Sequence, residues 1–600
     1  MQRTDPLVLG RIAAVCAAYA ALSFVVQNTY YQHVLTIVAI FAVLGLSWNV
    51  LGGYAGVVSF GHAAFFGIGA FAVTLLLSVW NVTPWLGIPV GMAVAALAAV
   101  LIGLPTLRLR GIHFALAMLA YPIVLRYVLD WLRYQEVMLP RKAKDTAWFM
   151  QFDDVHVYAL LAIAMLFVAM CVCHVIERSR FGLALRAIKQ NEQAAAAAGI
   201  DIWRRKMVAT AISGAMAGAA GGLYVVVIRV AVPADVFGLH VSAQAMVVTL
   251  FGGIGTLWGP LIGAAFLIPL GEGLHAVLGH TIPGVQSMVY GVALILAIMV
   301  APEGLFWYAH DRWTAWRGSR GSTAAAAQDA GRPQPAPGTG EAPAAHSGSG
   351  ARQGAGTLLQ VRNLSKSFRG VKAVDDVGFD VPEGVVFGLI GQNGAGKTST
   401  FNLLNGFIRA DAGSALFAGR DLVGLSPTQV SRLGVGRTFQ VPRPFPRLSV
   451  MDNVLAGAIS TEPDDAAAVA RSRQALATLG LAARAEALAA ELNAVELRLL
   501  ELGRALAGSP RLLLLDEIFA GLAHEEIEQL LLVIRRLPRE GVTVMIIEHT
   551  MHAMLKICDH LVVLDHGVVI ASGAPMSVIN DPTVVEAYLG RKWMAEHAAA

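Results

Sequence analysis

The sequence predicts a polytopic α-helical membrane domain followed by an α/β domain with a phosphate-binding loop. Composition is the first reason: 56% of the 600 residues are hydrophobic and only 14% are charged, which is abnormal for a soluble protein. The apolar excess is confined to residues 1–310, whereas residues 357–600 have the composition of a soluble domain. Residues 391–398 supply the third observation, because their Gly-x-x-x-x-Gly-Lys-Thr spacing is that of a phosphate loop.

The membrane domain is predicted from apolar segments of about 20 residues, the length that crosses a bilayer. So many consecutive apolar segments cannot be explained as the buried helices of one large soluble core. The first is interpreted as a membrane helix rather than a secretory signal, because Arg11 interrupts it and more spans follow. The segments lie near residues 8–27, 33–52, 56–80, 85–104, 112–132, 157–177, 207–231, 241–279 and 283–301.

Basic residues indicate the orientation of this domain. They gather in short loops, as is typical of cytoplasmic loops, so loop 178–206 and the chain after residue 310 are both predicted to be cytoplasmic. An even number of crossings must separate them. Segments 207–231 and 283–301 supply two, and segment 241–279 must therefore cross twice or not at all.

Residues 252–260 interrupt that last segment with the sequence Gly-Gly-Ile-Gly-Thr-Leu-Trp-Gly-Pro. The interruption fits a re-entrant or broken helix, and such backbone survives at membrane depth only against protein or a watery path. It is either a candidate translocation element or a place where small residues let helices pack closely.

Residues 316–356 are rich in Ala, Gly, Pro and Ser, and cannot bury enough apolar surface to fold. We expect a flexible tether with a reach on the order of 35 Å. The predicted domains are thus a membrane domain at 1–315, a linker at 316–356 and the α/β domain at 357–600.

The phosphate loop is predicted to follow a strand at 384–390 and to open a helix at Lys397. Backbone N–H groups of such a loop cradle the phosphates of ATP, Lys397 reaches the β- and γ-phosphates, and the Thr398 hydroxyl binds Mg²⁺. The residues predicted to hold the nucleotide are Gly391, Gln392, Asn393, Gly394, Ala395, Gly396, Lys397, Thr398 and Ser399.

Two further apolar strands end in polar residues suited to hydrolysis. The strand 511–517 delivers Asp516, expected to hold Mg²⁺ through water, and Glu517, expected to polarise the attacking water as general base. The strand 542–547 leads to His549. The carboxyl ends of parallel strands meet at one edge of a sheet, so His549 is expected to sense the γ-phosphate.

These motifs, in this order, resemble the ABC ATPase family over about residues 357–590. Arg437-Thr438-Phe439-Gln440 is similar to the Q-loop, whose glutamine is implied to contact Mg²⁺ or water and to abut the permease. Phe368 stands where the family stacks an aromatic ring on adenine. The resemblance implies an ATPase with Glu517, His549 and Gln440 as its catalytic residues.

One motif departs from the family. The signature Leu-Ser-Gly-Gly-Gln is replaced by Leu-Asn-Ala-Val-Glu at 492–496, and Ala523 stands in place of the D-loop aspartate. Val495 lacks the open backbone and Glu496 brings like charge toward phosphate. Since the family sandwiches each nucleotide between two subunits, this implies a different ATPase partner with an intact signature.

The membrane domain resembles the permeases of branched-chain amino acid importers over about residues 30–303. The α/β domain independently resembles their ATP-binding subunits at Gly436–Gln440, Phe445-Pro446 and Ala587–Gly590. The permease matches are Leu51–Ala70, Leu107–Gly111, Phe181–Ile188, Gly199–Asp201 and Gly252–Pro260.

Two features of the permease resemblance carry alternatives. The Ala-rich stretch in loop 186–201 looks like the coupling helix, expected to dock near Gln440, and the alternative is an ordinary solvated loop. His62 either lines the path or hydrogen-bonds a neighbouring helix, and the second is favoured.

The sequence therefore predicts a fused half-importer that takes branched-chain or related amino acids across the cytoplasmic (inner) membrane, with its ATPase in the cytoplasm. Implied partners are a second permease, a second ATPase, an extracytoplasmic substrate-binding protein and membrane lipid. The net charge of +4 gives no support to nucleic-acid binding. Two alternatives remain: a different cargo (urea, amides, aromatic or organic acids), or a membrane-bound ATP-binding regulator with little turnover.

Overall fold

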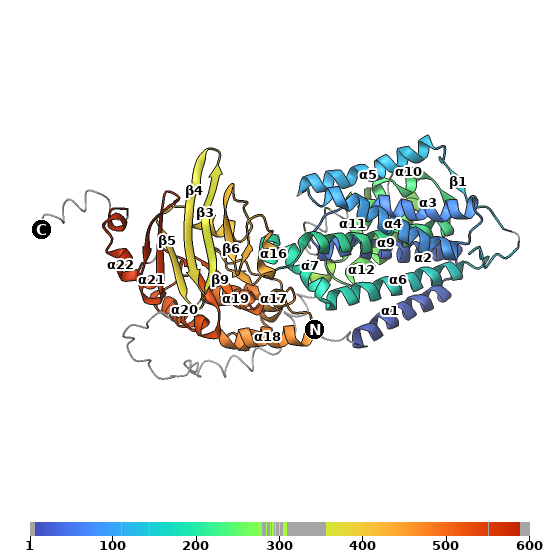
Figure 1. Ribbon diagram of the computed structural model, residues 1–600. Helices are drawn as coiled ribbons and strands as arrows, with labels where there is room; N and C mark the ends of the chain where they lie inside the picture. The colour runs from blue at the N-terminus through green and yellow to red at the C-terminus, as the bar shows by residue number, and fades with distance from the viewer. Residues whose placement is uncertain are drawn as a thin grey trace, which may run out of the picture. The chain divides into compact units, whose positions relative to one another are not determined.

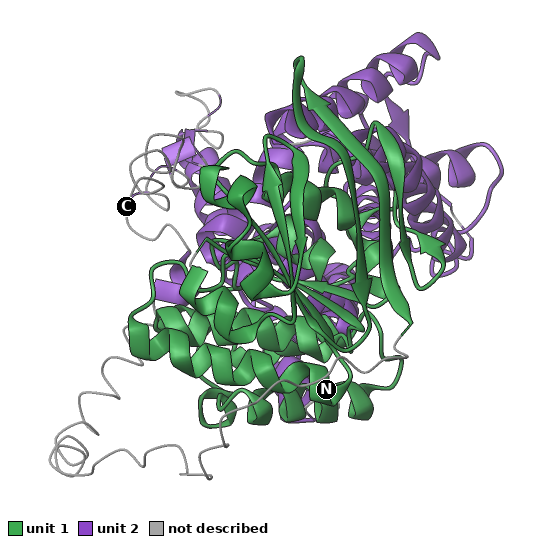
Figure 2. Cartoon of the chain, turned by 60° about the vertical axis from the view of Figure 1, so that its left-hand side comes forward, with its two compact units in different colours: residues 1, 190–202, 343–600 green, residues 2–189, 203–342 purple. Residues whose placement is uncertain are grey.

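The computed structural model describes residues 6–109, 111–142, 144–278, 284, 288–289, 291–292, 295, 299, 304–308, 356–549 and 551–587. They divide into two compact units (Figure 2). The first unit holds the described residues before 190 and those from 203 to 308. The second holds residues 190–202 together with the described residues from 356 onward. The predicted linker up to residue 355 and most of the predicted span 283–301 lie outside the described residues.

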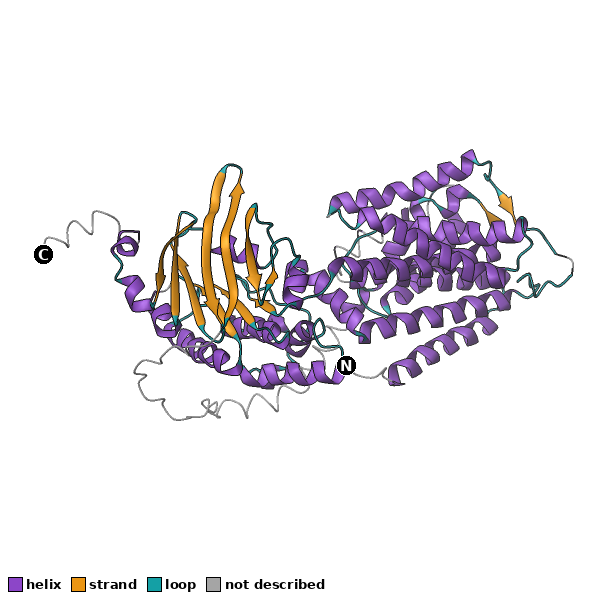
Figure 3. Cartoon of the chain, in the orientation of Figure 1, coloured by secondary structure: helices purple, strands orange, loops and turns teal. Residues whose placement is uncertain are grey.

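The first unit is helical, and its described residues include two strands of two residues each (Figures 1 and 3). Among its described residues, eight helices are long and apolar enough to cross a bilayer. The central one is α2 with its extension η1, which is almost entirely buried and packs against α6, α11 and α12. Its elements are α1 Pro6–Val25, α2 Thr29–Trp48, η1 Asn49–Tyr54, α3 His62–Ser78, α4 Pro84–Thr106, α5 Ile112–Trp131, β1 Val137–Met138, α6 Val155–Arg178, α7 Arg180–Gln190, α9 Ile202–Ile228, β2 Val230–Ala231, α10 Pro233–Val236, α11 Leu239–Gly252 and α12 Gly259–Leu278.

Two stretches of non-helical backbone interrupt these helices. Gly253 (φ +137°) and Gly255 (φ +75°) lie between α11 and α12 and confirm the interruption predicted at 252–260. The prediction of a span from residue 56 was wrong in its first six residues, because α3 begins only at His62. Asn49, the first residue of η1, bonds to the break between α11 and α12: its Nδ2 donates to Thr256 O (2.9 Å) and its Oδ1 accepts from Gly255 N (2.8 Å). Backbone that leaves the helix is thereby paired inside the protein.

His62 lies fully buried at the start of α3. Its Nε2 is 2.8 Å from Ser213 Oγ on α9, and its Nδ1 is 3.2 Å from Ser59 Oγ. Ser213 in turn donates to Ser47 O on α2 (2.8 Å). His62 thus makes the bond to a neighbouring helix that the favoured interpretation predicts.

The second unit contains two sheets (Figure 3). Strands β5, β9 and β10 are buried along their whole length, as expected for parallel strands covered on both faces. They belong to a six-stranded sheet of order β12-β11-β5-β10-β9-β8, in which only β12 is antiparallel, and the other sheet is antiparallel with order β4-β3-β6-β7. The strands are β3 Thr357–Phe368, β4 Val371–Pro382, β5 Val386–Gly391, β6 Ala412–Phe417, β7 Arg420–Asp421, β8 Val435–Arg437, β9 Leu512–Asp516, β10 Thr543–Ile547, β11 His560–Asp565 and β12 Val568–Gly573.

Helices of the second unit pack on these sheets, and two apolar clusters fill the spaces between the layers. These sheets and helices confirm the predicted α/β fold, in which a helix begins at Lys397 as expected. The helices are α8 Glu192–Ala197, α15 Lys397–Leu404, α16 Pro427–Arg432, α17 Val450–Ala458, α18 Asp465–Thr478, α19 Ala494–Ala507, α20 His524–Arg536, α21 Met551–Ile557 and α22 Pro575–Ile579, with 3₁₀ turns at Ala482–Arg484, Ala489–Glu491 and Leu537–Glu540.

Candidate active site

The loop between β5 and α15 is held open by its glycines. Gly391, Gly394 and Gly396 have φ of +156°, +86° and +98°, a region that other residues rarely adopt. A Cβ on Gly391 would lie 2.2 Å from Leu564 O, and one on Gly396 would lie 2.2 Å from Ala373 O. The backbone therefore approaches its neighbours too closely for a side chain, and its N–H groups are left to line the loop.

Lys397 fills the mouth of this loop. Its Nζ donates to Gly391 O (2.8 Å) and Gln392 O (2.9 Å), and only 5% of the residue is exposed. Burial lowers the pKa of Lys397, while the carboxylates of Glu517 and Asp516 act in the opposite direction. The ammonium is thus placed where a phosphate oxygen can replace the two carbonyls.

The other predicted loop residues surround it. Gln392 and Asn393 are exposed, Ala395 is buried, and Thr398 and Ser399 are half-buried on the first turn of α15. The Gln392 side chain donates to Ala587 O.

Asp516 ends β9 in the interior of the sheet. Its Oδ2 accepts from Arg437 Nη2 (3.1 Å), and both side chains are at most 4% exposed. Burial raises the pKa of Asp516, and the Arg437 guanidinium opposes that rise. The Oδ1 atom is buried with no hydrogen-bond partner among the described residues. An unpaired carboxylate oxygen beside the phosphate loop fits a water bound to Mg²⁺, because carboxylates and waters are the ligands that this ion prefers.

From the sequence, Arg437 was identified only as part of the Q-loop motif, and its contact with Asp516 was not predicted. Its guanidinium also lies 5.3 Å and 5.2 Å from the rings of Phe407 and Phe439, and its Nη1 donates to Asn402 Oδ1 (2.7 Å). The available signal was a charge at the end of the otherwise buried apolar strand β8.

Glu517 and Gln440 lie together at the edge of the sheet. Gln440 Nε2 donates to Glu517 Oε2 (2.6 Å), and Glu517 N donates to Ile547 O (2.9 Å). Glu517 has φ +45°, a strained value for a residue with a side chain and one often found at functional sites. The structure thus brings two of the three predicted catalytic residues into direct contact.

His549 lies at the same sheet edge, two residues beyond Ile547, which pairs with Asp516. Its side chain is 56% exposed, and no hydrogen bond joins it to Glu517 or Gln440 in the part of the chain that the structure describes. The preceding Glu548 is buried and accepts from Phe519 N (2.8 Å), and its burial raises its pKa.

Phe368 ends β3 and is 42% exposed, with Lys366 Nζ 5.6 Å from the centre of its ring. The same β3–β4 hairpin carries Ala373, whose carbonyl abuts Gly396 of the phosphate loop. The partly exposed ring thus lies on the hairpin that abuts the phosphate loop.

Helix α19 bonds to the loop that holds Gln440, a feature that motif matching missed. Glu501, 2% exposed, accepts from Phe439 N (3.2 Å) and Arg443 N (2.9 Å). Arg498 donates from Nη1 to Gln440 O (2.6 Å) and from Nη2 to Ala520 O (3.2 Å). Buried charges three residues apart on an amphipathic helix were the signal that could have found this connection.

The signature segment starts that helix. The Asn493 side chain accepts from Glu496 N (2.9 Å), and Glu496 Oε2 accepts from Asn493 N (3.0 Å), which together form a capping box. Glu496 Oε1 also lies 3.5 Å from Arg484 Nε. The carboxylate predicted to repel phosphate therefore has a cationic neighbour and an amide donor.

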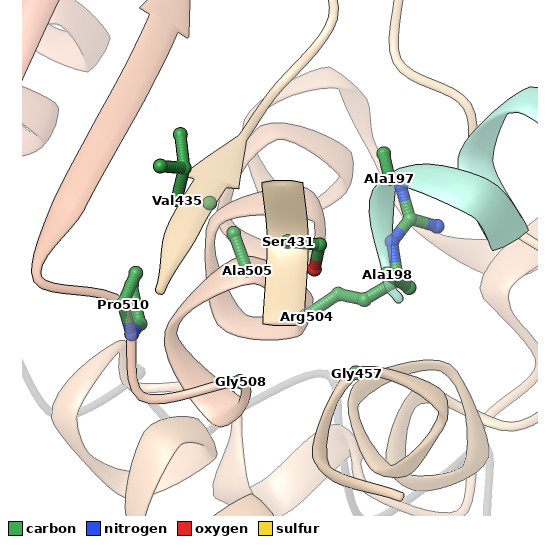
Figure 4. Close-up of a pocket in the computed structure, with 10 residues that line it drawn as sticks. Ala197, Ala198, Ser431, Val435, Gly457, Arg504, Ala505, Gly508 and Pro510 are labelled. Atoms are coloured by element: carbon green, nitrogen blue, oxygen red, sulfur yellow. The ribbon is translucent and has the colours of Figure 1, made fainter. Parts of the chain in front are cut away.

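Residues 190–202 belong to the same compact unit as the ATP-site residues. Asn191 caps α8 by accepting from Ala194 N (2.9 Å). Ser460 Oγ donates to Ala198 O (2.5 Å), and Thr428 Oγ1 donates to Ile200 O (3.1 Å). A small pocket nearby is lined by residues of this segment and by Ser431, Gly457 and Arg504, among others (Figure 4).

The loop that follows Gln440 also hydrogen-bonds to residues 190–202. Arg443 pairs with the Gln193 side chain, and Arg447 N donates to Gln190 Oε1 (2.8 Å). Arg504 donates to Arg443 O (2.8 Å), which links this contact to α19. The segment is thus packed against the loop after Gln440 and is not an ordinary solvated loop.

Comparison with known families assigns both parts of the chain. Residues 30–300 match the permease component of branched-chain amino acid transport systems. Residues 374–520 match the ABC transporter family. The chain belongs to the ABC transporters. It fuses a permease domain of the branched-chain amino acid type to an ABC ATPase domain that binds ATP and couples its hydrolysis to transport.

Relatives of this ABC transporter match its ATPase domain over nearly their whole length. The probable branched-chain amino acid transport ATP-binding protein LivG of Archaeoglobus fulgidus is 36% identical over 251 residues, which are 39% of this chain and 95% of the relative. The lipopolysaccharide export system ATP-binding protein LptB of Acidithiobacillus ferridurans is 38% identical over 233 residues, 39% of this chain and 97% of the relative. A solved nucleotide-free ATP-binding cassette from an ABC transporter is 32% identical over 39% of this chain and 100% of its own, with a TM-score of 0.37.

The family and the eight apolar helices indicate a membrane protein whose ATPase domain lies in the cytoplasm. ABC importers as a family work with partner subunits and a substrate-binding protein.

Proposed function

We propose that this chain is a half-importer that uses ATP to take branched-chain or related amino acids across the cytoplasmic (inner) membrane. The observation that carries the proposal is the permease match over residues 30–300, since the ATPase domain is similar both to a relative named for branched-chain amino acid transport and to one named for lipopolysaccharide export. The proposed domain boundaries are 1–315, 316–356 and 357–600.

The ATP site contains groups for each part of hydrolysis. Backbone N–H groups of 391–396 and the Lys397 ammonium bind phosphate oxygens, and Phe368 stacks on the base. Thr398, Gln440 and Asp516 would hold Mg²⁺, which would supply positive charge to the β- and γ-phosphates. Glu517 accepts the proton of the attacking water, oriented by Gln440, and His549 contacts the γ-phosphate when the site closes.

Closure reaches the permease through residues 190–202. The loop after Gln440 bonds this segment through Arg443 and Arg447. A movement of the Q-loop on nucleotide binding therefore displaces the coupling segment. A second permease and an extracytoplasmic binding protein complete the transporter.

A second ATPase with an intact signature completes the site built by this chain's phosphate loop. The replaced signature at 492–496 makes the opposite site less active. It also favours one candidate of another class, a membrane-bound ATP-binding regulator with little turnover. Under that alternative the chain would bind ATP without driving uptake.

Uptake measurements test the cargo. Cells or proteoliposomes that contain the chain with its accompanying subunits are expected to accumulate labelled leucine, isoleucine or valine only with ATP. Unlabelled urea, amides and aromatic or organic acids should not compete. Uptake of one of these compounds in place of the amino acids would contradict the proposed cargo.

A further inference from the structure

A cavity of about 450 Å³ in the permease unit is not used by the proposed ATP cycle. It lies where the beginning of α2, the beginning of α6 and the end of α9 come together. Its volume falls within the range of about 300–1,000 Å³ that is typical of small-molecule sites. The residues that line it include Tyr30, His33, Phe152, Asp153, Tyr158 and Arg229.

The direction of two helices places this cavity at the extracytoplasmic end. Helix α6 ends at Arg178 and α9 begins at Ile202, so both ends adjoin the coupling segment on the cytoplasmic side. The cavity lies at their opposite ends, beside Tyr158 and Val227. At 1.5 Å per residue, helices of 24 and 27 residues span about 36–40 Å, enough to cross a bilayer.

Charges of both signs line the cavity without cancelling each other. Arg229 and Asp153 are exposed, and neither forms an ion pair within the described residues. The aromatic side chains and Val155 and Val227 supply apolar wall. A cation, an anion and apolar surface together match a ligand with a carboxylate, an ammonium and a hydrocarbon side chain.

A network of hydrogen bonds fixes the cation in place. Arg229 Nη2 donates to Tyr158 OH (3.2 Å) and Phe152 O (3.4 Å). The Tyr158 hydroxyl also accepts from Phe152 N (3.0 Å) and donates to Met150 O (3.1 Å). Arg229 adopts φ +64° between α9 and β2, where Val230 and Ala231 pair with β1. A guanidinium held in this way is preorganised for an anionic group.

We propose that this cavity is an extracytoplasmic site for a zwitterionic amino acid, with Arg229 binding the carboxylate and Asp153 the ammonium. The site receives substrate before it enters the membrane path. The inference rests on the proposed import function and deepens it, because it assigns part of substrate recognition to the permease rather than to the binding protein alone.

Direct binding to the transporter tests the site. The full-length chain, purified with its accompanying subunits and without binding protein, is titrated with labelled L-leucine in nanodiscs. Competitors are 4-methyl-2-oxopentanoate, which lacks the ammonium, and isopentylamine, which lacks the carboxylate. Leucine should compete at least about tenfold better than either analogue, since each lacks one charge-assisted hydrogen bond.

Substitutions locate the binding. Arg229→Gln and Asp153→Asn should each weaken leucine binding at least about tenfold, and Arg229→Lys should recover part of the loss. Asp153→Asn keeps the test informative if loss of the Arg229 bonds unfolds the loop. Arg133→Gln is the matched control, because Arg133 is also an exposed arginine at positive φ (+67°) but lies outside the cavity, and it should bind leucine normally.

Unchanged affinity in both Arg229→Gln and Asp153→Asn would overturn the inference. Competition by both analogues as strong as that by leucine would also overturn it, and so would a loss of binding in Arg133→Gln equal to the loss in Arg229→Gln. If the wild-type transporter takes up leucine while these variants bind it normally, only this inference fails. If the wild type takes up a different cargo and no leucine, the proposed function fails and the inference with it.

Discussion

Arg437 supplies the positive charge beside the buried Asp516 carboxylate, at a sequence separation of 79 residues. Arg437→Gln should lower the free energy of unfolding by about 3–5 kcal/mol, because it leaves a buried carboxylate without its counter-charge. Hydrogen exchange of the β8 and β9 amides in the full-length chain measures the loss. The double variant with Asp516→Asn should recover much of it.

Arg420→Gln, an exposed change on the neighbouring sheet, is the control and should leave exchange unaltered. Equal protection in Arg437→Gln and the wild type would contradict a stabilising role for the pair.

An exposed pair in the antiparallel sheet predicts a dependence of stability on pH. Hydrogen bonds from Lys366 Nζ (2.6 Å) and Ser367 N hold the pKa of Asp411 below its ordinary value of 3.8. The stabilisation is fully present above that ordinary value and is lost as the pH falls through the lower folded value. The midpoint temperature of thermal unfolding should therefore fall less steeply between pH 6 and pH 3 in Asp411→Asn than in the wild type. Equal slopes would show that the pair contributes nothing.

At the scale of elements, α19 carries both the replaced signature and the bonds to the Q-loop. Restoring Ser-Gly-Gly-Gln at 493–496 should raise ATP hydrolysis severalfold in the complete transporter, because the phosphate facing this segment gains donors and an open backbone. Steady-state ATPase measurement decides this. Glu496→Gln alone should give a smaller gain, since Arg484 already lies beside that carboxylate. No gain in either variant would mean that the native segment works as it stands.

The coupling segment offers a test that separates transport from hydrolysis. Gly199 has φ +80°, and a Cβ there would lie 2.7 Å from Ser460 Oγ. Gly199→Val should displace the segment and abolish uptake while part of the ATPase activity remains. Gly480→Val is the matched control, because Gly480 has a similar φ (+73°) with nothing within 4 Å of the added atom. Uptake that survives in Gly199→Val would argue against this route of coupling.

Elements that are determined by residues close together in the sequence could be predicted from the sequence. The phosphate loop, β9 and β10 are encoded by glycine spacing and continuous apolar runs, and the structure places them as expected. The start of α3 was missed because Gly56 and Gly61 lie in an apolar run that resembles a helix. The side-chain bonds of Arg437, Arg498 and Glu501 join segments that are far apart in the sequence. No local sequence pattern shows which of these segments will lie beside one another in the fold.

At the scale of the whole molecule, the chain supplies one permease domain and one ATPase domain, and the transporter that we propose contains two of each kind. A phosphate loop of the family pattern beside a replaced signature implies an asymmetric pair of ATP sites in that transporter. Such a transporter would depend on the site built from this chain's own phosphate loop, with Glu517 as its base.

The central claim is that hydrolysis at this site drives uptake, and Glu517→Gln tests it most directly. Gln440 Nε2 contacts Glu517 at 2.6 Å, so the variant keeps the shape of the site while removing the carboxylate. Reconstituted with its subunits in proteoliposomes, the variant should bind ATP but lose ATP turnover and leucine uptake together, whereas the exposed change Glu525→Gln should keep both. Uptake that persists in Glu517→Gln would contradict the claim.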